Sequence, residues 1–369
     1  MTYRITMGAR VRKSPFFTAT VAHGVTQFSA YNHMLMPTSY GDPDAEYQAL
    51  TERVSIWDVA CERQVEVVGP DAPALVQYLS ARDMATCPVG RARYTPICDH
   101  DGTLINDPIT LRLSDDRFWL SIADGDLELW ARAVAVERGL DCAVFEPDVS
   151  PLAVQGPRAD DTMADLVGEW ARDLSFFAFV ETNLDGIPLV VCRSGWSGQG
   201  GFELFLTDGS RGGELWDRVW EAGLAYGIHP GTPNPAERIE SGLLSYRCDC
   251  AGSATPLELG LGRFLTLDRD DEFVGKAALL AERESGPARR LVKVSLSGDR
   301  LAAPSEHPWP ARDAHGSPVG EVRVAVWSPA LGSNLALALV EASAAGSGFT
   351  ALTPDGDELV ATHLSFFGE

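Results

Sequence analysis

The chain has 369 residues, of which 30 are Lys or Arg and 52 are Asp or Glu, so its formal net charge is −22. This acidic balance argues against a nucleic-acid-binding protein and against a peripheral anchor on anionic lipid, because both need clustered positive charge. No apolar run approaches the roughly 18 residues that a membrane-spanning helix needs, and the first eight residues lack the pattern of a signal peptide. A hydrophobic share of 45% is that of an ordinary globular protein.

The cysteines and the length set further limits. Seven cysteines are scattered along the chain without a Cys-x-x-Cys pair. Together with the absence of a signal segment, this favours reduced thiols and a cytoplasmic location. The length suggests about two or three domains.

The first third of the chain alternates between strand and helix patterns. Residues 63–69 alternate polar and apolar like a half-buried strand, and a helix at 74–79 follows Asp and Pro start signals. Residues 94–105 predict a hairpin with an Asp-Gly turn. A strand at 118–123 and a helix at 127–138 come next.

The remainder predicts a change of architecture near residue 285. Short strands separated by Gly, Pro and Ser occupy 291–296, 319–327 and 335–340. We therefore predict an α+β protein with a β-rich, barrel-like final domain. The expected division is an N-terminal region at 1–145 (discontinuous, with part of 230–284), a second region at 146–284, and the last domain at 285–369.

Several common motifs are incomplete. Residues 260–265 start like a dinucleotide fingerprint but lack its third Gly, and 195–199 lack the closing Gly of a nucleophile elbow. Cys98, His100 and Asp101 lie close together, but the predicted hairpin turn explains them better than a metal does. We predict no metal site.

The segment richest in chemical features is 193–205. Four glycines within seven residues allow a ligand to approach the backbone, and the same loop presents Trp196. Glu203 follows between Phe202 and Leu204 and therefore points to the opposite face of its strand. A glycine-rich hairpin with a surface Glu is the alternative.

Other candidates are isolated charged or aromatic side chains. Asp107, in Asn106-Asp107-Pro108, places a carboxylate at a strand end, unless it only forms a turn. Arg238, on an expected helix that runs to Tyr246, either faces a ligand carboxylate or forms a solvated ion pair. The N-terminal aromatic residues, Tyr31 among them, belong either to the core or to a pocket wall.

These segments in order resemble the aminomethyltransferase-like (glycine-cleavage T-protein) superfamily. The resemblance covers nearly the whole chain and is carried by residues 56–69, 102–107, 195–203, 238–246, 273–279 and 320–329. It implies a ring of three domains with a C-terminal β-barrel-like domain and tetrahydrofolate as co-substrate in the centre.

Within the superfamily, the chain is most similar to the dimethylsulfoniopropionate demethylases. Residues 12–16, 31–37, 61–66, 106–108 and 199–201 carry this likeness. It implies methyl transfer from a small sulfonium compound to N5 of tetrahydrofolate. The expected partners are a small-molecule methyl donor and folate, and the expected assembly is a monomer or homodimer.

The resemblance also implies roles for the candidate residues. Asp107 would be catalytic, either as a base or as an electrostatic partner of N5. The donor would contact Tyr31, Ser121 and Trp196, where an aromatic ring attracts a cation by about 0.5–2 kcal/mol. The folate would contact Tyr94, Glu203 and Arg238, of which the carboxylate of Glu203 suits adjacent N–H donors of a pterin.

Two departures leave the donor open. The chain has Gly198 where these demethylases have Lys, and Arg247 where they have Gly. A folate-dependent transferase with another donor, such as betaine, dimethylglycine or a substrate of specialised metabolism, is one alternative. The aminomethyltransferase of glycine cleavage is another. The Cys-containing signature of the superfamily's iron–sulfur assembly factor is missing.

Overall fold

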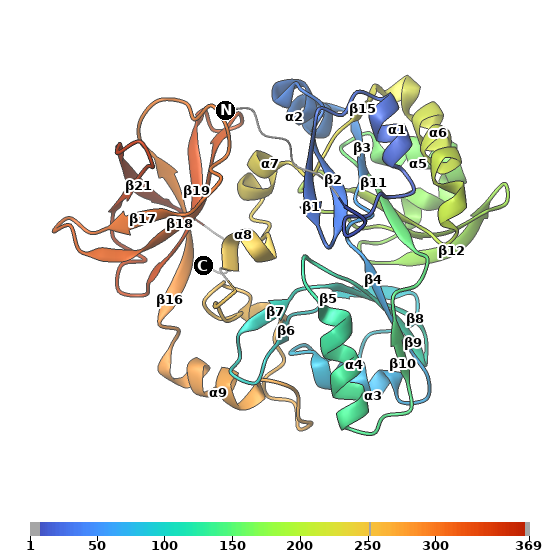
Figure 1. Ribbon diagram of the computed structural model, residues 1–369, viewed down its shortest axis with the longest axis horizontal. Helices are drawn as coiled ribbons and strands as arrows, with labels where there is room; N and C mark the ends of the chain where they lie inside the picture. Colours follow the sequence, from blue (N-terminus) through green and yellow to red (C-terminus); the bar gives the residue numbers. More distant parts are fainter. Residues whose placement is uncertain (1–7, 251, 366–369) are drawn as a thin grey trace.

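The computed structural model describes residues 8–250 and 252–365, so residues 1–7 of the segment considered for a signal peptide lie outside the described residues. Three lobes surround a central region occupied by α7 (Pro235–Glu240) and α8 (Tyr246–Cys250) (Figure 1). One lobe is a closed barrel, and each of the other two is a sheet covered by helices. The predicted α+β ring with a C-terminal barrel is confirmed.

The first lobe is built on a six-stranded sheet in the order β12-β13-β14-β11-β3-β15. Its strands are β3 (Val54–Asp58), β11 (Ser150–Gln155), β12 (Phe179–Leu184), β13 (Ile187–Cys192), β14 (Gly201–Leu206) and β15 (Ile228–Pro230). The two sides of residue 145 share this sheet, because β3 pairs with β11. Helices α1 (Phe17–Ala22), α2 (Pro43–Glu52), α5 (Ala159–Val167) and α6 (Gly212–Gly223) and the hairpin β1 (Gln27–Tyr31)–β2 (Met34–Ser39) complete the lobe.

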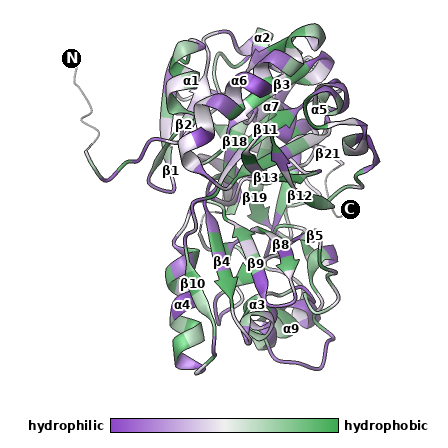
Figure 2. Cartoon of the chain, turned by 90° about the vertical axis from the view of Figure 1, so that its right-hand side faces the viewer, coloured by the Kyte–Doolittle hydropathy of each residue, from purple (hydrophilic) through white to green (hydrophobic). Residues whose placement is uncertain are grey.

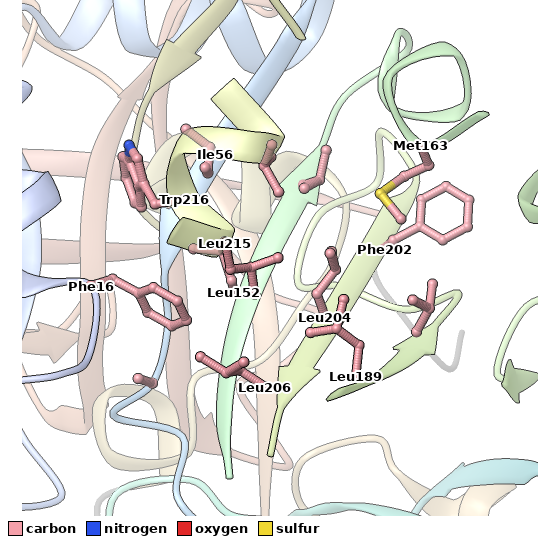
Figure 3. Close-up of a cluster of buried hydrophobic side chains, with 14 of the residues drawn as sticks. Phe16, Ile56, Leu152, Met163, Leu189, Phe202, Leu204, Leu206, Leu215 and Trp216 are labelled. Atoms are coloured by element: carbon pink, nitrogen blue, oxygen red, sulfur yellow. The ribbon is translucent and has the colours of Figure 1, made fainter. Parts of the chain in front are cut away.

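The alternation of β14 determines which side chains reach the core. Phe202, Leu204 and Leu206 point into an apolar cluster with Leu215 and Trp216 of α6 (Figure 3). Because successive side chains of a strand point to opposite faces, Glu203 and Phe205 lie on the other face. Phe205 packs there against Trp119 of the second lobe. The carboxylate of Glu203 is therefore directed toward the junction of the two lobes.

The second lobe is a five-stranded antiparallel sheet in the order β10-β4-β9-β8-β5. Its strands are β4 (Gln64–Val68), β5 (Arg91–Tyr94), β8 (Ile109–Ser114), β9 (Arg117–Ser121) and β10 (Ala143–Phe145), and its helices are α3 (Ala72–Leu79) and α4 (Leu127–Glu137). The predicted hairpin is confirmed as β6 (Ile97–Cys98) with β7 (Leu104–Asn106).

The third lobe is a closed barrel in the order β16-β19-β18-β17-β20-β21. Its strands are β16 (Arg289–Leu296), β17 (Trp309–Arg312), β18 (Pro318–Ser328), β19 (Ser333–Glu341), β20 (Phe349–Leu352) and β21 (Glu358–Leu364). It follows α9 (Lys276–Ser285). Closure leaves this sheet without a free edge strand.

The helix expected to run from Glu237 to Tyr246 is interrupted, which corrects the sequence-based prediction. Gly242 has a φ of 76°, and Leu243 N–H donates to the carbonyl of Arg238 at 2.7 Å. A glycine in the left-handed conformation ends a helix by turning the chain away from its axis. As a result, α7 and α8 are separate helices, and Arg238 of α7 pairs with Asp249 of α8.

Hydropathy follows these layers. Green segments concentrate in the sheets, whereas purple segments lie mainly on outer helix faces and loops (Figure 2). Within the described residues, no helix is both long and apolar enough to cross a membrane. All seven cysteines belong to that part of the chain and are free thiols.

Candidate active site

Asp107 lies just after β7, and Tyr94 ends β5. The Tyr94 hydroxyl donates a hydrogen bond to Oδ2 of Asp107 at 2.9 Å, and the Tyr94 ring packs on Phe264 with centroids 4.8 Å apart. Burial raises the pKa of Asp107 to about 7, with a further contribution from the charge of Asp249, while the bond from Tyr94 opposes the rise. A carboxyl group with a pKa near neutrality can accept or release a proton under ordinary conditions.

Two buried asparagines fix the surroundings of Asp107. Asn106 exchanges two hydrogen bonds of 3.0 Å with the main chain of Ala123. Asn32, in the turn of the β1–β2 hairpin, donates to the carbonyl of Cys61 at 3.0 Å and accepts from Gly125 N–H at 2.8 Å. These bonds hold the hairpin turn, the start of the β3–β4 connection and the segment 122–125 together.

Glu203 is the second acidic group of the site. Its side chain is 8% exposed, and its Oε2 accepts a hydrogen bond from the Ser194 hydroxyl. Burial raises the pKa of the Glu203 carboxyl group, and the bond from Ser194 opposes that change. The carboxylate is therefore enclosed, in contrast to the surface Glu that was the alternative reading.

Glu62 is a third acidic group, which the sequence analysis did not single out as a site residue. It lies in the connection between β3 and β4, where burial and then the charges of Glu203 and Asp107 raise its pKa well above the usual value. The only available signal was its place in the run 61–66, used above for the resemblance alone. In the described part of the chain, no Lys, Arg or His forms an ion pair with Glu62, Asp107 or Glu203. We call these three side chains the acidic cluster.

Tyr31, at the end of β1, lies within electrostatic range of this cluster. Burial raises the pKa of Tyr31 well above 10, and the charges of Glu62, Cys61 and Asp107 raise it further. Ser121 ends β9 and is 8% exposed; its hydroxyl accepts a hydrogen bond from Gln64 at 2.9 Å. Ser121 leads directly into the segment 122–125 that holds Asn32 and Asn106.

Trp196 and Arg238 form a neighbouring group. The guanidinium of Arg238 lies 5.6 Å from the centre of the Trp196 ring, and Trp196 donates to the carbonyl of Leu244 at 2.9 Å. Arg238 is 3% exposed and pairs with both oxygens of Asp249 at 2.8 and 3.1 Å. The solvated ion pair considered for Arg238 is therefore a buried pair within the protein. Its partner Asp249 contributes to the pKa shift of Asp107.

The glycine-rich loop is fastened to α7 by Glu237. Oε1 of Glu237 accepts from Gly198 N–H at 2.9 Å, from the Gln199 amide at 3.1 Å and from the Ser241 hydroxyl at 2.7 Å. A Cβ on residue 198 would lie 2.8 Å from Cβ of Ser241. The space beside Gly198 is thus filled by α7, so this loop has no room for the Lys of the demethylases.

The site is built from residues that lie far apart in the sequence, between Tyr31 and Asp249. It brings together four side chains around Glu62, namely Tyr31, Tyr94, Asp107 and Glu203. Trp196 and Arg238 are connected to this group by Asp249, which pairs with Arg238 and whose charge acts on Asp107. Among the described residues, no group of three or more His, Cys, Asp or Glu side chains is arranged to hold a metal ion. The arrangement suits a ligand that brings positive charge or N–H donors to carboxylates that are wholly or partly buried.

The lobes and the barrel define the class of protein. Residues 16–269 match the GCVT N-terminal domain, and residues 289–363 match the glycine cleavage T-protein C-terminal barrel domain. The chain therefore belongs to the glycine cleavage T-protein family, and it is an enzyme. The fold is also that of the glycine cleavage system aminomethyltransferase T from Bartonella henselae, with a TM-score of 0.85 over 97% of this chain and 98% of that one, at 22% identity.

Other relatives share a higher sequence identity with this chain. The chain is 44% identical to the dimethylsulfoniopropionate demethylase DmdA of Ruegeria pomeroyi, over 97% of this chain and 98% of that protein. It is 31% identical to an aminomethyltransferase of Saccharopolyspora erythraea, over 93% and 94%. It is 33% identical to a trimethylamine-oxide aldolase of R. pomeroyi, over 92% of this chain but only 44% of that longer protein.

Proposed function

We propose that this protein is a tetrahydrofolate-dependent demethylase that moves a methyl group from a small sulfonium compound, first of all dimethylsulfoniopropionate, to N5 of the folate. The observation that carries this proposal is the acidic cluster, whose three carboxyl groups have raised pKa values and no cationic partner in the described protein. A donor with a fixed positive charge supplies that partner. The similarity to the demethylase of R. pomeroyi supports the same substrate.

The donor side of the site consists of Tyr31, Ser121 and Trp196. An aromatic ring next to a sulfonium stabilises its charge by about 0.5–2 kcal/mol. The ring of Trp196 already lies beside the guanidinium of Arg238. We therefore assign Trp196 to the wall of the site next to the buried Arg238–Asp249 pair. Tyr31, which lies within electrostatic range of Glu62 and Asp107, is the aromatic residue we assign to the cation.

The folate side consists of Tyr94, Glu203 and Arg238. When bound, the reduced folate supplies the nitrogen that accepts the methyl group. Glu203, held by Ser194, accepts hydrogen bonds from the pterin N–H groups. Both terminal nitrogens of Arg238 donate hydrogen bonds to the carboxylate of Asp249. We therefore propose that Arg238 positions α8 and does not itself bind a carboxylate of the ligand.

Asp107 is the residue that we assign to the proton released from N5. The electrons of the broken C–S bond stay on sulfur and give a neutral thioether, so the leaving group needs no acid. The proton that N5 loses needs an acceptor, and we assign this role to Asp107, whose carboxylate accepts a hydrogen bond from Tyr94. Most of the rate acceleration then comes from alignment of donor and acceptor.

The test is a donor screen. Enzyme, tetrahydrofolate and dimethylsulfoniopropionate are mixed under anaerobic conditions, and mass spectrometry measures 5-methyltetrahydrofolate and the thioether. We expect both in equal amounts, and about 10²- to 10³-fold less with Asp107→Asn. Glycine betaine and dimethylglycine are run in parallel. Absence of methylated folate with every donor contradicts the proposal. If methylated folate forms with betaine alone, betaine is the donor, and methyl transfer to the folate remains the reaction.

A further inference from the structure

Arg247 is a cation at the edge of the donor side of the site. It is the second residue of α8, and its Nε donates to the main-chain carbonyl of Asp124 at 3.0 Å and lies 3.6 Å from the Asp124 carboxylate. Oδ1 of Asp124 in turn accepts from the N–H of Asn32 at 2.9 Å. Arg247 therefore contacts the segment that begins at Ser121 and that holds the turn following Tyr31.

The guanidinium of Arg247 is only partly used. In the part of the chain that the structure describes, its side-chain hydrogen bond is donated by Nε, and its two terminal nitrogens form no hydrogen bond. The side chain is 62% exposed. An unoccupied pair of parallel N–H groups is the arrangement that binds a carboxylate through two hydrogen bonds.

The neighbouring residue connects Arg247 to the acidic cluster. Burial raises the pKa of Tyr246 to about 12; the charges of Cys250, Asp107 and Asp124 add to the rise, whereas the charge of Arg247 opposes it. Tyr246 is thus within electrostatic range of both Asp107 and Arg247. The site thus has acidic groups inside and, on the side of Tyr246, the guanidinium of Arg247 at its edge.

We propose that Arg247 recognises the carboxylate of the methyl donor, so that the enzyme selects a zwitterion with its onium end at the acidic cluster and its anionic end at the Arg247 guanidinium. This inference rests on the proposed function and adds the second charge of the substrate. It assigns a specificity-determining role to Arg247, beside the hydroxyl of Ser121 at the other end of the segment 121–124.

The test compares two donors that differ only at the far end. Dimethylsulfoniopropionate has a carboxylate, and its primary amide has the same sulfonium and chain length without that charge. With Arg247→Gln we expect KM for the acid to rise about 10- to 100-fold, and KM for the amide to change by less than about twofold. Arg247→Lys keeps the charge but not the paired N–H groups and should lie between the two.

The matched control is Arg300→Gln. Arg300 is 57% exposed and pairs with Asp44, away from the site residues, so its loss should leave both KM values unchanged. Thermal melting verifies that each variant is folded, and calorimetry of acid and amide binding gives a second readout independent of turnover. If Arg247→Gln changes acid and amide equally, or changes neither, the inference is overturned. If wild-type enzyme methylates no folate but binds the acid through Arg247, the proposed function fails, while recognition of the zwitterion's carboxylate by Arg247 stands.

Discussion

At the scale of single residues, the raised pKa of Asp107 predicts a pH profile. If Asp107 accepts a proton, it must be ionised, so kcat/KM, which reports the free enzyme, should rise with pH through about 7 and then level off. Tyr94→Phe removes the hydrogen bond that lowers this pKa, and it should therefore move the rising limb to higher pH. The measurement is kcat/KM against pH for wild type, Tyr94→Phe and Asp107→Asn. A limb that stays in place in Tyr94→Phe contradicts the assignment to Asp107.

The same carboxyl group predicts how stability depends on pH. Its pKa is about 7 in the folded protein against a usual value of 3.8, so the folded protein retains a proton that the unfolded chain loses between these values. The free energy of unfolding therefore falls as pH rises toward 7. Asp107→Asn removes this effect, and urea unfolding should show a larger gain in stability for the variant at pH 8.5 than at pH 5. An equal difference at both pH values would be inconsistent with a raised pKa.

Residue by residue, what the sequence could predict follows from local pattern. Strand alternation indicated that Glu203 opposes Phe202 and Leu204, and the strand end indicated the place of Asp107. Glu62 has no such local signal, because the charges that raise its pKa come from Glu203 on β14 and from Asp107 after β7, which lie far from it in the sequence. The partner of Arg238 was equally hidden, since Asp249 lies in α8, beyond the Tyr246 end of the helix that the sequence predicted.

At the scale of elements, the contact between the glycine-rich loop and α7 predicts a specific steric conflict. Gly198→Ala places a Cβ 2.8 Å from Cβ of Ser241 and disturbs the bond from Gly198 N–H to Glu237. We expect the free energy of unfolding to fall by about 1–3 kcal/mol. Adding Ser241→Gly removes the clashing atoms and should restore part of the loss.

The control for this pair is Gly213→Ala in α6, where an added Cβ meets nothing within 4 Å. It should leave stability unchanged or raise it slightly, because Ala favours a helix over Gly. Urea unfolding curves of the four proteins give the comparison. If Gly198→Ala is as stable as Gly213→Ala, the loop is not held against α7 as described.

Strands were predictable where their own residue pattern defines them, but the strand with which each one pairs was not. The strands near 291–296, 319–327 and 335–340 correspond to β16, β18 and β19. The pairing of β3 with β11 joins segments about a hundred residues apart, and alternation alone does not select a partner strand. This is why the sheets cross the boundary expected at residue 145.

At the scale of the whole molecule, Glu240 joins three parts of the ring. Its Oε2 accepts from the hydroxyl of Tyr47 on α2 at 2.7 Å, and its Oε1 accepts from the hydroxyl of Ser328 at the end of β18 at 2.6 Å. Ser328 is fully buried. One carboxylate on α7 thus connects the first lobe to the barrel, and the ring depends on contacts of this kind because the covalent chain joins its lobes at few points.

Removing that carboxylate should weaken the ring as a unit. Glu240→Ala leaves the buried Ser328 hydroxyl without its partner, which costs about 1–3 kcal/mol, whereas Glu240→Gln retains an acceptor oxygen and should lose less. The control is Glu341→Ala, an exposed carboxylate at the end of β19 that forms no side-chain hydrogen bond or ion pair within the described residues. Calorimetric unfolding measures all three variants. Equal melting of Glu240→Ala and Glu341→Ala would show that the barrel is held to the first lobe by apolar packing and not by this carboxylate.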